Sequence, residues 1–222
     1  MLLIGMLDSP FVRRVGISLH RHGLAFEHGN WSVGRDAEKI RRYNPLLRVP
    51  TLVLDDGEVL TESSTILDYL DELAGPARSL LPASGAPRRQ ALQIMALAIG
   101  AAEKTRDSVY ERQFRPAEKM HQPWLERLDS QVRGALGLLE QRAAKLAAGS
   151  GWLGEPLTQA DISATCALTF IRDAKPLDLA AEYPALERQR RRCEVLPEFT
   201  ATYTPFFAPQ PAAQASPPAG PR

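Results

Sequence analysis

Short apolar runs alternate with amphipathic segments over the first third of the chain. Residues 2–6 form a brief apolar run that ends at a turn-forming Asp-Ser-Pro sequence, so they predict a buried strand. The apolar positions within residues 11–19 recur with helical spacing. They predict a helix that begins at Pro10, where a missing N–H costs nothing, and stops at Gly23.

The same alternation continues up to a third helix. Residues 26–31 predict a second short strand, and the polar segment 36–43 predicts an exposed helix. The β-branched run 48–54 predicts a strand that pairs as a hairpin with residues 59–61 across an Asp-Asp-Gly turn. An apolar helical face then predicts a helix over 62–73.

The second half of the chain has helical periodicity only. Apolar stripes predict long helices over 86–114 and 121–148, with a break at an Arg-Pro pair, and another helix starts at Tyr183. A segment rich in Pro, Ala, Ser and Gly separates the two halves. The tail is rich in Pro, Ala, Gln and Ser, a composition that predicts mobility. The expected divisions are a first domain over 1–76, a linker over 77–87, a helical domain over 88–207 and a mobile tail over 208–222.

The charge balance excludes several classes of partner. With 27 Lys and Arg residues against 26 Asp and Glu residues, the net charge is +1, which gives no field to attract nucleic acid or an anionic membrane. The first apolar run is too short for a signal peptide, and no run reaches membrane-spanning length. We therefore expect a cytoplasmic protein with no nucleic-acid or membrane partner.

Cysteine and histidine are too sparse for a disulfide framework or a metal site. Cys166 and Cys193 are far apart, and small buried core residues are the simplest interpretation of both. The four histidines form no helical pair with a carboxylate partner. The sequence therefore predicts no bound metal.

Two of the predicted helices begin with residues that leave polar groups at a helix N-terminus. Ser9 is placed to act as the N-cap before Pro10, and Glu62 and Ser63 head the later helix. The free amides and the positive dipole of such a terminus favour an anion. Each group, taken alone, is also explained by helix capping.

A proline stands near the start of the third predicted strand. Pro50 removes one hydrogen-bond donor from the ladder, which leaves the backbone of Val49 free to pair with an extended peptide, particularly if the bond between them is cis. An ordinary trans proline at the start of a strand is the alternative.

A capping box is predicted at the start of a later helix. Thr158 and Asp161 have its spacing, and Leu157 and Ile162 are placed to form the accompanying hydrophobic staple. We expect both polar residues to serve folding rather than catalysis.

Arginines are concentrated in the helix that starts at Tyr183. Arg188, Arg190, Arg191 and Arg192 have the composition of an anion site. A solvated helix face is the preferred interpretation, because most charged runs are simply surface.

The order of elements and three short motifs resemble the glutathione transferases. The segment Ser9–Val12 stands where glutaredoxins have Cys-Pro-x-Cys, Val49–Pro50 matches the cis-proline motif of the family, and Glu62–Ser63 matches its γ-glutamyl site. The capping box matches that of the family's buried core helix. The resemblance implies an α/β N-terminal thioredoxin-like domain (βαβαββα) followed by an all-α helical domain.

The resemblance also implies roles for individual residues. Glutathione would lie extended along the first domain, with its γ-glutamyl end on Glu62 and Ser63, its cysteinyl unit against the backbone of Val49, and its glycyl carboxylate near Arg48. Ser9 would donate a hydrogen bond that stabilises the thiolate. Cysteine-based disulfide exchange is disfavoured, because neither the first nor the last residue of Ser9–Val12 is cysteine.

A second-substrate pocket is expected between the two domains. Met6, Leu7, Tyr110 and Phe114 are the candidate lining residues. The chain departs from the family at Leu47, where a glycine often stands two residues before the Val-Pro motif.

The expected activity is conjugation of glutathione, the co-substrate, to a small, largely apolar electrophile. Glutathione-dependent isomerisation, dehalogenation or peroxide reduction on the same scaffold is one alternative. A non-catalytic interaction module that keeps the fold is another. The resemblance further implies a homodimer.

Overall fold

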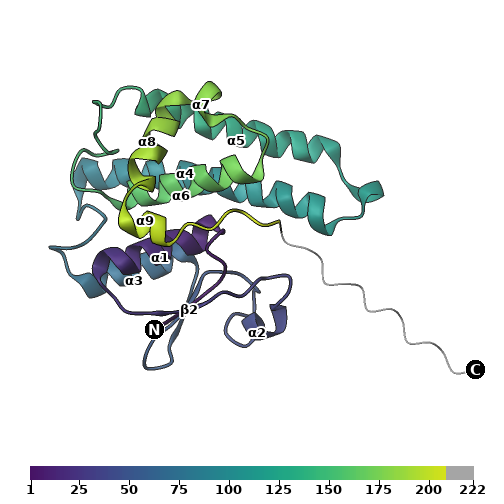
Figure 1. Cartoon of the computed structure of the whole chain (residues 1–222), viewed down its shortest axis with the longest axis horizontal. Helices are drawn as coiled ribbons and strands as arrows, with labels where there is room; N and C mark the ends of the chain where they lie inside the picture. The colour runs from purple at the N-terminus through teal and green to yellow at the C-terminus, as the bar shows by residue number, and fades with distance from the viewer. Residues whose placement is uncertain (209–222) are drawn as a thin grey trace, which may run out of the picture.

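The structure is a computed structural model that describes residues 1–208, so the predicted tail lies outside the described residues except for Ala208. A small sheet with its helices forms one layer, and a bundle of long helices forms the other (Figure 1). Across residues 1–208, every helix is too short or too polar to cross a membrane.

The first domain contains the predicted order of strands and helices. Its sheet has the order β2-β1-β3-β4, with β2 parallel to β1 and the other neighbouring pairs antiparallel. The hairpin is confirmed, because Thr51 pairs with Thr61. The elements are β1 (Leu2–Ile4), α1 (Pro10–His22), β2 (Glu27–Gly29), α2 (Ala37–Arg41), β3 (Thr51–Val53), β4 (Val59–Thr61) and α3 (Ser63–Ala74).

Glycine is required where β1 ends. Gly5 has a φ of 132°, and a Cβ atom there would lie 2.6 Å from Cγ2 of Val12 and 2.8 Å from Cβ of Val49. The absence of a side chain therefore lets the end of β1, the start of α1 and the loop before β3 approach one another.

The remaining part is helical, as predicted. Its helices are α4 (Gly85–Phe114), the short 3-10 turn η1 (Ala117–Lys119), α5 (Gln122–Ala143), α6 (Gln159–Ala174), α7 (Leu179–Glu182), α8 (Pro184–Glu194) and α9 (Pro197–Ala201). The expected helix over 121–148 runs five residues past the end of α5, which stops at Ala143 and is followed by turns.

Helix α6 is the centre of the helical part, and the capping box at its start is confirmed. The Asp161 carboxylate accepts hydrogen bonds from the Thr158 amide at 2.9 Å and from the Thr158 hydroxyl at 2.8 Å. It also accepts the Trp152 amide at 3.0 Å and pairs with Arg192. Leu157 and its expected staple partner share one buried cluster.

The arginine-rich helix α8 is only partly the solvated face that the sequence predicts. Arg188 and Arg191 are exposed, but Arg190 is buried and binds Glu187 in a bidentate pair at 2.8 Å. Arg192 is half-buried because it reaches the capping box of α6. The prediction is therefore wrong for Arg190 and Arg192, whose carboxylate partners hold them in the interior.

Helix α1 lies between the sheet and the helical bundle (Figure 1). Arg13 crosses from α1 to α8, where its guanidinium binds both carboxylate oxygens of Glu194 at 2.8 and 2.6 Å and the Phe199 carbonyl at 2.9 Å. Because these groups are largely buried, the pair fixes how α1 sits against the bundle.

Asp161→Ala is expected to lower the free energy of unfolding by about 2–4 kcal/mol, because it leaves two buried amides and Arg192 without their acceptor. Urea denaturation measures the change. Glu58→Ala is the control, because Glu58 is exposed and its loss should cost less than about 0.5 kcal/mol. Equal costs for the two variants would contradict the role given to Asp161.

Stability is expected to fall as the pH drops through about 6.5. Burial lowers the pKa of His22, whose Nε2 lies 3.3 Å from Asp71. Below that pH the unfolded chain takes up a proton that the folded chain does not, so protonation favours unfolding. Thermal melts at about pH 7.5 and 5.5 should show the difference, reduced in His22→Gln and retained in His121→Gln, an exposed control.

Candidate functional site

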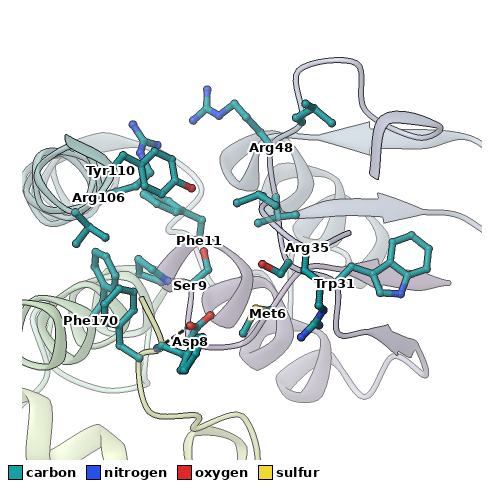
Figure 2. Close-up of a pocket in the computed structure, with 18 of the residues that line it drawn as sticks. Met6, Asp8, Ser9, Phe11, Trp31, Arg35, Arg48, Arg106, Tyr110 and Phe170 are labelled. Carbon is teal, nitrogen blue, oxygen red and sulfur yellow. Dashed lines mark hydrogen bonds between the residues drawn. The ribbon is translucent and has the colours of Figure 1, made fainter. Parts of the chain in front are cut away.

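A cavity of about 890 Å³ lies where the two parts of the chain meet. Its walls come from the start of α1, the loop after β2, the loop before β3, helix α4 and the segment after α9 (Figure 2). A second cavity of about 60 Å³ continues along the first domain between the loop before β3 and the start of α3.

Ser9 stands at the wall of the larger cavity, at the N-terminus of α1 (Figure 2). Its backbone has N-cap geometry, with φ −72° and ψ 124°, and its carbonyl accepts the Arg13 amide at 2.9 Å. The expected capping bond of the side chain is absent: within residues 1–208 the Ser9 hydroxyl has no hydrogen-bond partner. The hydroxyl is therefore free to bind a ligand beside the positive end of the helix.

The loop before β3 forms the wall next to Ser9. Its Val49–Pro50 peptide is cis, and both the amide and the carbonyl of Val49 lack a backbone partner among the described residues. Leu47 has a φ of 52°, a left-handed conformation that favours glycine. The leucine that stands here in place of the expected glycine is therefore strained. Val49 thus presents an unpaired peptide unit to the cavity.

Asn44 holds this loop, a role that the sequence does not reveal. Its side-chain amide donates to the Arg48 carbonyl at 2.9 Å and to the Thr51 hydroxyl at 3.2 Å, and its carbonyl oxygen accepts the Leu46 amide at 3.0 Å. The side chain of Arg48 is exposed and lies at the rim of both cavities.

Glu62 and Ser63 come together at the smaller cavity. Glu62 has a φ of 72°, and its carboxylate accepts the Ser64 amide at 2.9 Å and the Ser63 hydroxyl at 3.1 Å. The same carboxylate thus caps α3 and lines the cavity. Ser63 is buried, whereas Glu62 is exposed.

A buried arginine lies beneath these two residues. The Arg14 guanidinium donates to the hydroxyls of Ser63 at 2.6 Å, Ser64 at 2.9 Å and Ser163 at 3.2 Å, and no carboxylate contacts it within residues 1–208. Desolvation lowers the pKa of Arg14 to about 10, so the group stays charged near neutral pH. It therefore orients the Ser63 hydroxyl and adds positive charge beneath the smaller cavity.

The outer wall of the larger cavity is aromatic. Met6 and Tyr110 line it as predicted, and burial raises the pKa of Tyr110. Leu7 and Phe114 do not line it: Leu7 packs into the core of the first domain, and Phe114 stacks edge-on against Tyr110 at 5.2 Å. Other aromatic residues, which the sequence did not predict for this cavity, complete the wall: Phe11, Trp31, Phe170, Phe206 and Phe207.

Charged groups also line the larger cavity, Asp8 and Arg106 among them. Asp8 precedes Ser9, and burial raises the pKa of its carboxyl group. Arg106 of α4 lies 5.6 Å from the centre of the Phe11 ring and donates to Asp107 at 2.7 Å. Among residues 1–208 there is no cluster of metal-ligating side chains.

Comparison with known proteins identifies the same two parts. The family profile described as glutathione S-transferase, N-terminal domain, matches residues 3–78, and the C-terminal domain profile of that family matches residues 122–188. The uncharacterized GST-like protein YibF of Escherichia coli is 34% identical over 140 residues, which cover 63% of this chain and 68% of that protein. Glutathione transferase GST 23 of Zea mays is 28% identical over 89 residues, 40% of each chain.

Solved structures are similar over nearly the whole chain. A glutathione S-transferase from Methylobacterium radiotolerans in complex with glutathione sulfonate has 28% identity and a TM-score of 0.83, with 99% of each chain covered. A glutathione transferase family member from Pseudomonas fluorescens with bound glutathione has 32% identity and a TM-score of 0.78, with 95% of this chain and 98% of that chain covered.

Ser63→Ala is expected to lower the free energy of unfolding by about 1–3 kcal/mol, because the buried Arg14 guanidinium loses its shortest hydrogen bond. Thr65→Ala, an exposed substitution in the same helix, should cost less than about 0.5 kcal/mol. Chemical denaturation of both variants tests the assignment. A Ser63→Ala variant as stable as the wild type would show that Arg14 does not depend on this hydroxyl.

Proposed function

The chain belongs to the glutathione S-transferase family, and we propose that it conjugates the thiolate of glutathione to a small, largely apolar electrophile. The observation that carries this proposal is the unpartnered Ser9 hydroxyl, which faces the cavity at the N-terminus of α1 beside the unpaired backbone of Val49. The solved relatives with bound glutathione or glutathione sulfonate support the co-substrate.

The first domain offers groups that match each end of glutathione. Glu62 carries a carboxylate for the ammonium of the γ-glutamyl unit. The Ser63 hydroxyl, which accepts from Arg14, would turn its proton from Glu62 to the carboxylate of that unit. The cysteinyl peptide unit would pair with the backbone of Val49. Arg48 is the cation at the rim for the glycyl carboxylate.

Ser9 is proposed to stabilise the thiolate of glutathione rather than to attack the electrophile itself. A free thiol has a pKa near 8.5 and is mostly protonated at neutral pH. A hydrogen bond from the Ser9 hydroxyl and the positive end of α1 both favour the thiolate. Lowering the thiol pKa by one unit requires about 1.4 kcal/mol of preferential binding, which one charge-assisted hydrogen bond can supply.

The aromatic half of the larger cavity is the place proposed for the electrophile. The thiolate sulfur would form a bond to an electrophilic carbon, which releases a leaving group with its electron pair or passes electrons to a neighbouring carbonyl that then takes a proton from water. A cavity with apolar walls favours an apolar electrophile and keeps the thiolate partly desolvated and reactive.

The chain's own sulfurs are poor candidates for the chemistry. Burial raises the pKa of Cys166 to about 12 and that of Cys193 to about 11, and neither lines the larger cavity. A thiol with such a pKa is almost entirely protonated near neutral pH. This supports conjugation through glutathione sulfur over disulfide exchange by a protein cysteine.

We also propose a symmetric homodimer in the cytoplasm. Leu92 of α4 is 43% exposed and lines a cavity of about 300 Å³ between α3 and α4, whose other lining residues are partly apolar. Such a face supports burial against a second copy. The cysteines are free thiols, as is usual for cytoplasmic proteins.

The test is a titration of glutathione into wild type, Ser9→Ala and Ser84→Ala, with the ultraviolet absorbance of the thiolate followed against pH. Wild type should bind glutathione and lower the thiol pKa, whereas Ser9→Ala should bind with a thiol pKa about one unit higher. Ser84 is an exposed N-cap serine of α4 outside the cavity, so Ser84→Ala should match the wild type.

Two results would count against the proposal. An unchanged thiol pKa in Ser9→Ala would remove Ser9 from the mechanism. A wild-type protein that binds no glutathione would favour the non-catalytic module.

A further inference from the structure

The segment that follows α9 lies across the outer side of the larger cavity. Phe206 and Phe207 form part of the cavity wall, although they are almost 200 residues from Ser9 in the sequence. Figure 1 shows this segment running from α9 past the start of α1. The position of the segment therefore decides how far the cavity extends on this side.

Two aromatic contacts hold the first part of the segment. The Tyr203 ring lies 5.4 Å from the Arg13 guanidinium carbon, and its hydroxyl is 3.4 Å from Arg172. Phe206 packs edge-on against Phe170, with ring centres 5.2 Å apart and planes at 82°. These contacts place the Phe206 ring against the helical bundle.

Beyond Phe206, Asp8 holds the segment. The Phe207 amide donates a hydrogen bond of 3.1 Å to Oδ2 of Asp8, while the Phe207 side chain is 62% exposed. A bond to an ionised acceptor is stronger than one between neutral groups. Because the Phe207 side chain is largely solvated, this backbone bond is the main attachment of Phe207 to the wall.

Asp8 also has an unusual place for a carboxylate. It adjoins Ser9, where an anionic ligand is proposed, so its negative charge works against a thiolate there. Burial raises the pKa of the carboxyl group, which shows that its position costs desolvation energy. The presence of a carboxylate at position 8, despite these two costs, is explained by the hydrogen bond that Asp8 accepts from the Phe207 amide.

We propose that Asp8 determines the substrate range of the enzyme by holding residues 206–208 over the cavity through its hydrogen bond to the Phe207 amide, a bond that we call the tie. With the tie in place, Phe207 closes the outer side of the cavity, which then favours a flat, apolar electrophile over one with a long substituent. Without it, Phe207 and Ala208 move away from Asp8 and the outer side opens. The identity of the nucleophile in this proposal rests on the proposed glutathione function, whereas the tie itself does not.

The shape and chemistry of the lining support that choice of electrophile. The rings come from both parts of the chain, and those of Phe11, Tyr110 and Phe170 lie on one side of Ser9 (Figure 2), so a flat apolar ring can stack against them. The rings of the lining belong to Phe11, Trp31, Tyr110, Phe170, Phe206 and Phe207.

The tie is tested by limited digestion with chymotrypsin, which cleaves after aromatic residues, on wild type, Asp8→Ala and Asp8→Asn. Intact mass reports the rate of cleavage within residues 203–208. Loss of the bond in Asp8→Ala should raise that rate about tenfold, the factor that corresponds to one hydrogen bond of this kind. Asp8→Asn keeps an acceptor oxygen without the charge, so its rate should lie much closer to that of the wild type.

The substrate range is tested by calorimetry with S-methylglutathione and S-hexylglutathione, two conjugates that differ in the length of the sulfur substituent. The ratio of the S-hexyl to the S-methyl dissociation constant should fall about three- to tenfold in Asp8→Ala and by less than twofold in Asp8→Asn. The ratio cancels any general effect of the substitution on glutathione binding.

Each failure points to a different part of the proposal. Equal cleavage rates in wild type and Asp8→Ala would overturn the tie, and an unchanged ratio would overturn the control of substrate range. If Asp8→Asn behaved as Asp8→Ala does in both assays, the charge rather than the bond would be responsible. Failure of the wild type to bind S-methylglutathione would overturn the glutathione function, while the cleavage rates would still decide the tie.

Discussion

The burial of α1 against both parts of the chain is the constraint on which the site depends. Eleven of its thirteen residues are buried, two of them arginines that each bind groups beyond their own helix. Arg13 binds the end of α8, and Arg14 binds the start of α3 together with Ser163 of α6. Buried charges are costly unless hydrogen bonds compensate them, so these bonds favour one position of α1 along its axis. That position places Ser9 at the cavity wall.

Local sequence patterns were sufficient to predict the elements of the first domain and the helical second part. Apolar spacing distinguishes strands from helices, and Pro10 and Gly23 mark the two ends of α1. The Val49–Pro50 and Glu62–Ser63 motifs were recognised because each lies within two adjacent residues. The side-chain bond expected of Ser9 was wrong, because N-cap backbone geometry does not require that the hydroxyl turn towards the helix.

The features that the sequence did not reveal depend on residues far apart in the chain. Arg14 binds hydroxyls 49, 50 and 149 positions away, and serine has no spacing that marks it as a partner of arginine. Phe206 and Phe207 reach the cavity only because α9 turns the chain back towards α1. Leu7 was misplaced because it lies in the turn between β1 and α1, where no regular period shows which side chains face the core and which face the cavity.

The burial of both cysteines has a consequence for a protein that is proposed to bind electrophiles and conjugate them to glutathione. Cys166 and Cys193 are each 1% exposed, and they are the only two cysteines of the chain. A compound that reacts with glutathione thiolate also reacts with accessible cysteine thiolates, because both are sulfur nucleophiles. Since the chain offers no such thiolate, it is protected from covalent inactivation at cysteine by its own substrates. If it acts as proposed, it would turn over reactive compounds that would alkylate a protein with exposed cysteines.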